Sequence, residues 1–104
     1  MSRRCRVEYL PLAERDLLDI VDYIARDRPP AARVFVDRLD RAIARLGIFP
    51  CSGKQPTDDR LRRLGYRILV VQDFLVFYVI TGRVVQIRRI VHGAGRYDFL
   101  LPGE

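Results

Sequence analysis

This sequence of 104 residues has no tryptophan, one histidine, one lysine and two cysteines. The single histidine and the absence of a cysteine cluster argue against a structural zinc site. Cys5 and Cys51 form neither a CxxC pair nor a disulfide framework, so we interpret them as free thiols. No apolar run approaches the roughly 20 residues of a membrane-spanning helix, and the N-terminus has no apolar secretory core. We therefore expect a cytoplasmic protein with no membrane association, no bound metal and no cofactor.

Positive charge is abundant and is carried almost entirely by arginine. The chain has 19 basic and 13 acidic residues, a net charge of +6 and a pI of about 10.0. Residues 51–104 hold nine basic residues against five acidic ones, whereas residues 1–50 hold ten against eight. Arginine binds phosphate through a planar fork of donors. The basic excess therefore favours a nucleic acid or an acidic protein as partner.

Hydrophobic periodicity divides the chain into strands and helices. Apolar residues at Leu17, Ile20, Val21 and Ile24 follow the spacing of one helical face. The expected elements, in chain order, are a strand at 4–10, a helix at 13–26, a helix from about 30 to 46, a loop at 48–63, and strands at 66–71, 74–80 and 84–91. The two helices are joined by a short link through Pro29 and Pro30, which predicts a helix hairpin.

The last three strands form a predicted meander. Their connections, at residues 72–73 and 81–82, are short enough only for antiparallel hairpins. The apolar run 74–80 does not alternate, which indicates a central strand covered on both faces. In the last strand, alternation predicts Arg89 and Val91 on one face and Arg88 and Ile90 on the other.

The order of elements is therefore β-α-α-β-β-β. We predict a single α+β domain over residues 1–104, in which an antiparallel sheet carries the helix hairpin on one face and ends in a short C-terminal tail. Helices on one side would leave the other face of the sheet at least partly open to a substrate or partner.

Several segments, taken in order, resemble the RelE/ParE superfamily of bacterial type II toxins, and most nearly its ParE-like, plasmid-stabilisation branch. The segments are VEYLPLAERDL at residues 7–17, Gly65-Tyr66-Arg67, Val76-Phe77-Tyr78, and the run 89–93 followed by Arg96 and Asp98. The resemblance covers almost the whole chain and implies the fold just derived. It also implies a type II toxin that a cognate antitoxin from the same operon binds as a hetero-oligomer and neutralises.

The resemblance implies two activities that one fold supports. ParE-like members inhibit growth by binding DNA gyrase, and RelE-like members cleave mRNA on the ribosome without metal. The incomplete set of catalytic residues favours the gyrase inhibitor, with the metal-free endoribonuclease as the alternative. An inactive or simply nucleic-acid-binding member of the fold is the third interpretation.

Cleavage of RNA would need a general acid and base together with cations for the phosphorane. The candidate catalytic residues are His92, Arg89 and Tyr97, and the candidate substrate-binding residues are Arg67, Arg88 and Arg96. In the competing interpretation His92 is a turn residue, and the two adjacent arginines are solvated or pair with the antitoxin. The apolar tail of the chain is a candidate antitoxin-binding segment, formed by Phe99, Leu100 and Leu101.

Overall fold

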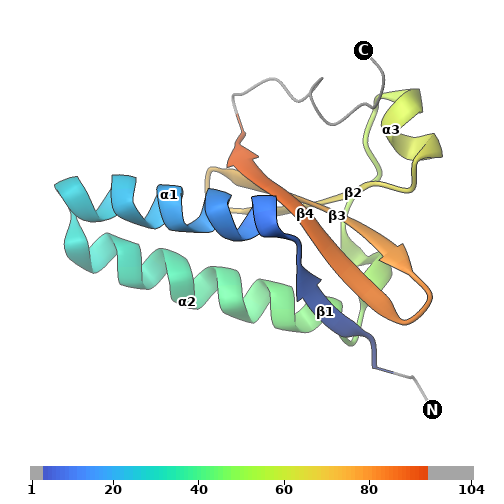
Figure 1. Ribbon diagram of the computed structural model, residues 1–104, viewed down its shortest axis with the longest axis horizontal. Helices are drawn as coiled ribbons and strands as arrows, with labels where there is room; N and C mark the ends of the chain where they lie inside the picture. The colour runs from blue at the N-terminus through green and yellow to red at the C-terminus, as the bar shows by residue number, and fades with distance from the viewer. Residues whose placement is uncertain (1–3, 94–104) are drawn as a thin grey trace.

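The computed structural model describes residues 4–93 (Figure 1). Its elements are β1 (Arg6–Tyr9), α1 (Pro11–Asp27), α2 (Pro29–Leu46), the 3₁₀ helix η1 (Pro50–Ser52), α3 (Asp59–Arg63), β2 (Arg67–Val71), β3 (Phe74–Thr81) and β4 (Val84–His92). Every strand and helix expected from the sequence is present, with ends within two residues of the prediction. None of the helices in this part of the chain is long and apolar enough to cross a membrane.

The four strands form one sheet in the order β1-β4-β3-β2. β2, β3 and β4 are the predicted antiparallel meander, and Gln72 and Gly82 take positive φ values in its two turns. β1, however, pairs in parallel with β4, so Arg6 lies opposite Val84. The α+β class is confirmed, but the sheet is mixed rather than wholly antiparallel. A short hairpin turn forces the two strands that it joins to be antiparallel. β1 is separated from the meander by residues 10–66, so no such turn determines its direction.

The helix hairpin covers one face of the sheet, as predicted. α2 buries Phe35, Leu39, Ile43 and Leu46 against the sheet, and α1 packs its Leu17, Ile20, Val21 and Ile24 against the same core. The strands contribute Val76 and Tyr78 from β3 and Ile87 from β4 to this core. Burial of these side chains away from water is the main force that holds the hairpin on the sheet.

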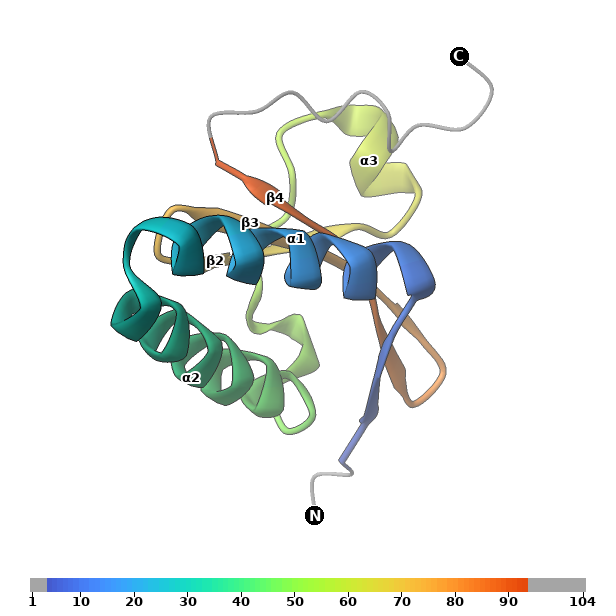
Figure 2. The same cartoon turned by 60° about the vertical axis from the view of Figure 1, so that its left-hand side comes forward.

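The other face of the sheet has a smaller core of its own. It is formed by Leu61 of α3, Tyr66, and the β3 residues Phe77 and Val79. Segment 48–63, which we expected to be a loop, contains η1 and α3. Asp58 caps α3 by accepting hydrogen bonds from the backbone N–H groups of Arg60 and Leu61. Figure 2 shows the sheet between α2 and α3, so this face is partly covered.

A β-bulge interrupts the pairing of β3 with β4. Phe77 lies opposite Arg89, but the next residue, Tyr78, lies opposite Ile87, so Arg88 is an extra residue without a partner. Because of this insertion, Arg88 lies on the same face as Arg89. The prediction that Arg88 shares a face with Ile90 was therefore wrong, because strict alternation does not hold across a bulge.

Candidate functional site

The strongest polar contact in the described chain joins α1 to the middle of β4. Asp16 accepts hydrogen bonds from Nε and Nη2 of Arg89, at 2.7 and 2.9 Å, and from the backbone N–H of Ile90, at 2.9 Å. β1 ends opposite Ile87, so Asp16 supplies an acceptor where the neighbouring strand has stopped. These hydrogen bonds raise the pKa of Arg89 above its usual value, although partial burial acts in the opposite direction.

Arg88 is directed over the ring of Tyr66. Its guanidinium carbon lies 5.7 Å from the ring centroid, and its Nη2 donates to Oε1 of Gln86 at 3.2 Å. The Nε atom of Arg88 is buried and makes no hydrogen bond. On the same face α3 carries Arg60, Arg62 and Arg63, of which Arg62 pairs with Asp59 and Arg60 with Asp58. This α3 side of the sheet is therefore rich in arginine.

Arg67 belongs to a different environment. It lies opposite Tyr78 in the β2–β3 pair, on the face covered by the helix hairpin. Its Nη1 donates to the backbone carbonyls of Cys51 and Gly53, at 3.1 and 3.0 Å. The hydroxyl of Tyr78 donates to the carbonyl of Pro50 at 2.7 Å and accepts from the N–H of Gly53 at 2.9 Å. Arg67 and Tyr78 together anchor the segment around η1 to the sheet.

His92 lies at the end of β4. It is opposite Phe74, and the two rings meet edge to face with their centroids 5.5 Å apart. The turn residue Asp73 lies at the same end of the sheet, because its carbonyl accepts a hydrogen bond from Gly93 at 2.7 Å. His92 is thus next to an aromatic ring that packs on the main core.

The structure therefore brings some of the predicted site residues together and separates others. Arg88 and Arg89 share the α3 side of the sheet, whereas Arg67 lies on the helix side and His92 at one end. The other predicted site residues, Arg96, Tyr97, Phe99, Leu100 and Leu101, lie outside the described residues. Among residues 4–93, the candidate catalytic and substrate-binding groups are therefore divided between the two faces of the sheet and one of its ends.

Asp16 is the important residue that sequence reasoning missed. It lies in a helix with four other acidic residues. A weak signal was present in the helical spacing, because Asp16 is four residues before Ile20 and so borders the buried helical face, whereas Asp19 and Asp22 lie on the opposite face. A helical position beside that face is where a carboxylate reaches a neighbouring strand.

A groove with both apolar and acidic character lies where β1, α1 and α2 meet. It has a volume of about 350 Å³ and is lined by Tyr9, Glu14, Leu17, Leu18 and Asp40. Burial is the main cause, and the nearby Asp40 carboxylate the second, of a pKa for the Tyr9 hydroxyl that is raised to about 12. The groove thus keeps its phenol neutral at physiological pH.

The raised pKa of Tyr9 predicts a specific loss of stability in alkali. The unfolded-state pKa is near 10 and the folded-state pKa about 12, so the folded state binds this proton more tightly. The resulting stability is fully present below pH 10 and is lost as the pH rises towards 12. The free energy of unfolding, measured by urea denaturation, should therefore fall more between pH 9 and pH 11 for the wild type than for Tyr9→Phe. An equal fall in the two proteins would contradict the raised pKa of Tyr9.

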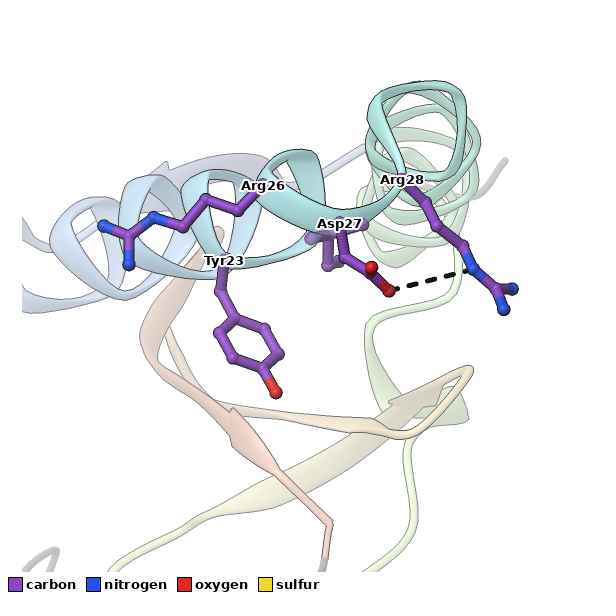
Figure 3. Close-up of a pocket in the computed structure, with 5 residues that line it drawn as sticks. Tyr23, Arg26, Asp27 and Arg28 are labelled. Atoms are coloured by element: carbon purple, nitrogen blue, oxygen red, sulfur yellow. Dashed lines mark ion pairs between the residues drawn. The ribbon is translucent and has the colours of Figure 1, made fainter.

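A second cavity lies at the tip of the helix hairpin (Figure 3). It has a volume of about 520 Å³ and is lined by Tyr23, Ile24, Arg26, Asp27 and Arg28. The side chain of Tyr23 extends from α1 towards the sheet and is 75% exposed. Asp27 and Arg28 form an ion pair with each other at 3.9 Å, so the acidic group here has its own counter-ion.

Comparison with known proteins gives a family match over most of the chain. Residues 7–97 match the family described as ParE toxin of type II toxin-antitoxin system, parDE. None of the curated proteins matches the sequence significantly.

Two solved structures share the fold. One is described as the chromosomal ParDE TA system from P. aeruginosa, with a TM-score of 0.71 and 20% identity over 86% of this chain and 96% of that one. The other is the toxin-antitoxin complex RelBE2 from Mycobacterium tuberculosis, with a TM-score of 0.57 and 22% identity over 86% of this chain and 98% of that one. At such identities the likeness concerns the fold alone.

Proposed function

This chain belongs to the ParE toxin family of type II toxin-antitoxin systems, and from that membership we propose that it stops growth by binding DNA gyrase. As a ParE-like toxin, it is one component of a two-protein system. The proposed action is that of a binding protein rather than an enzyme. It takes place in the cytoplasm, where gyrase works.

The separation of Arg67 from Arg89 is the observation that favours binding of gyrase over cleavage of RNA. Arg67 is on the helix side of the sheet, where it donates to two backbone carbonyls of the η1 segment. Arg89 is on the other side and is engaged by both oxygens of Asp16. Metal-free cleavage needs its cations and its general base around one phosphate. Two guanidinium groups on opposite faces, each already bonded, do not make such a cluster.

A cognate antitoxin is the second partner. The two solved structures with this fold are described as toxin–antitoxin systems. In this chain, residues 54–93 hold eight basic residues and three acidic ones. We propose that an acidic, amphipathic antitoxin segment binds the arginine-rich α3 side of the sheet, together with Phe99, Leu100 and Leu101 of the tail.

The test is induced expression in bacteria with parallel pulse labelling of DNA, RNA and protein synthesis. We expect early loss of DNA synthesis with gyrase-dependent DNA breaks. We also expect the His92→Ala variant to inhibit growth within about twofold of the wild type, because a residue outside the surface that binds gyrase contributes little to the affinity for gyrase. Co-expression of the operon's antitoxin should restore growth.

Two results would contradict the proposal. Early loss of protein synthesis with cut mRNA, abolished by His92→Ala, would make the protein a RelE-like ribonuclease. Salt-dependent binding to DNA of any sequence, without toxicity, would make it a nucleic-acid-binding member of the fold.

A further inference from the structure

Charge is unevenly distributed over this basic protein. α1 holds five acidic residues and two basic ones, although the whole chain has a net charge of +6. The basic excess lies instead in residues 54–93, which form α3 and the meander. The molecule therefore presents an acidic helix on one side and an arginine-rich surface on another. Two such surfaces attract partners of opposite charge.

The acidic helix borders the groove formed by Tyr9, Glu14, Leu17, Leu18 and Asp40. Three different elements contribute to it, namely β1, α1 and α2. Leu17 is partly buried and packs on the main core, whereas Leu18 is 63% exposed. An exposed leucine beside two carboxylates covers no core of this chain, and so it is available to a partner.

The two carboxylates of this groove differ from Asp16 and Asp27, which have a cationic partner within the chain. Among residues 4–93, neither Glu14 nor Asp40 forms an ion pair. Asp16, by contrast, is engaged by Arg89, and Asp27 at the hairpin tip pairs with Arg28 (Figure 3). In a chain so rich in arginine, two carboxylates at an apolar groove without an intramolecular cation provide a place for a cation from another molecule.

We propose that this groove binds an arginine or lysine side chain, flanked by an apolar residue, on the protein that the toxin inhibits. The aliphatic stem would pack on Leu17, Leu18 and the ring of Tyr9, while the cationic group would lie between Glu14 and Asp40. This inference rests on the proposed function, because it assigns a surface to the target. It also separates the target's surface from the arginine-rich surface proposed for the antitoxin.

Two other occupants fit less well. A second copy of the chain would have to place a different surface, for example Arg63 and the exposed Leu64, into the groove. Such a contact is head-to-tail and would build rings or open chains of molecules rather than a two-fold dimer. An acidic antitoxin segment would be repelled by Glu14 and Asp40, and would be attracted to residues 54–93.

The test uses charge reversal in the full-length protein. Glu14→Lys/Asp40→Lys changes the groove, and Asp19→Lys/Asp22→Lys makes the same change of net charge at exposed positions of α1 that do not line it. We expect the groove variant to bind purified gyrase about 30-fold more weakly or worse, because like charges would then face each other. It should lose growth inhibition and bind the antitoxin within about threefold of the wild type, whereas the control should keep all three properties.

Three outcomes would overturn the inference. The groove variant could bind gyrase and inhibit growth normally, or lose only antitoxin binding, or lose toxicity to the same extent as the control variant. If the groove variant does not fold, Leu18→Asp provides the test with a single change at an exposed position. If the wild type does not bind gyrase but still stops growth, the proposed function fails. The comparison of growth inhibition between the groove and control variants then still decides the inference.

Discussion

Replacing Asp16 by alanine is expected to lower the free energy of unfolding by about 3 kcal/mol, which is a large part of the stability of a domain this size. The substitution removes three acceptor contacts at once, two to Arg89 and one to Ile90. The side chains of Arg89 and Asp16 are 24% and 14% exposed, so water replaces these contacts only in part. The guanidinium and the backbone N–H would both be left without their main partner.

Urea denaturation measures this effect directly, and two variants serve as controls. Asp16→Asn keeps an oxygen that accepts from Ile90 but loses the charge that pairs with Arg89, so its stability should be intermediate. Asp19→Ala removes an exposed carboxylate from the same helix and should change the free energy of unfolding by less than about 0.5 kcal/mol. If Asp16→Ala were no more destabilising than Asp19→Ala, the contact between α1 and β4 would have no role in stability.

Substituting Gly53 by alanine is expected to cost about 2 to 3 kcal/mol, because no room exists for a methyl group there. A Cβ atom at this position would contact the hydroxyl oxygen of Tyr78, and it would lie 2.8 Å from Cε1 of that ring and 3.0 Å from the carbonyl of Ile68. Tyr78 is fully buried and bonded on both sides, so the ring has nowhere to move. The neighbouring η1 segment would have to shift instead.

A double-mutant cycle shows whether the hydroxyl of Tyr78 is the cause. Tyr78→Phe alone should cost about 1 to 3 kcal/mol, because the N–H of Gly53 and the carbonyl of Pro50 lose their partner. The double variant should be more stable than the sum of the two changes predicts, by about 1 kcal/mol, because removal of the oxygen makes room for the methyl group. Strict additivity would contradict this account. Ser52→Ala, at an exposed neighbouring position, should be nearly neutral.

Sequence patterns predicted the fold correctly wherever the residues of a single helix, strand or turn determine its structure. The apolar period of residues 17–24 predicted the buried side of α1, and the unbroken run of β3 predicted a strand covered on both faces. The two-residue breaks at 72–73 and 81–82 predicted antiparallel hairpins, because so short a connection permits no other pairing. α3 escaped prediction because five residues are too few for a helical period, although Asp58 is a recognisable capping residue.

The order of the elements, the helix hairpin, the meander and the resemblance to the ParE-like toxins thus follow from sequence patterns alone. The positions of the polar groups depend on tertiary packing. The bulge places Arg88 on the same face as Arg89, and Arg67 lies on the helix side. β1 ends opposite Ile87, so Asp16 accepts the hydrogen bond from the N–H of Ile90. Packing also places Glu14 of α1 and Asp40 of α2 in one groove. Periodicity depends on neighbours within one element, whereas these contacts join residues from different elements, and only packing determines which residues meet.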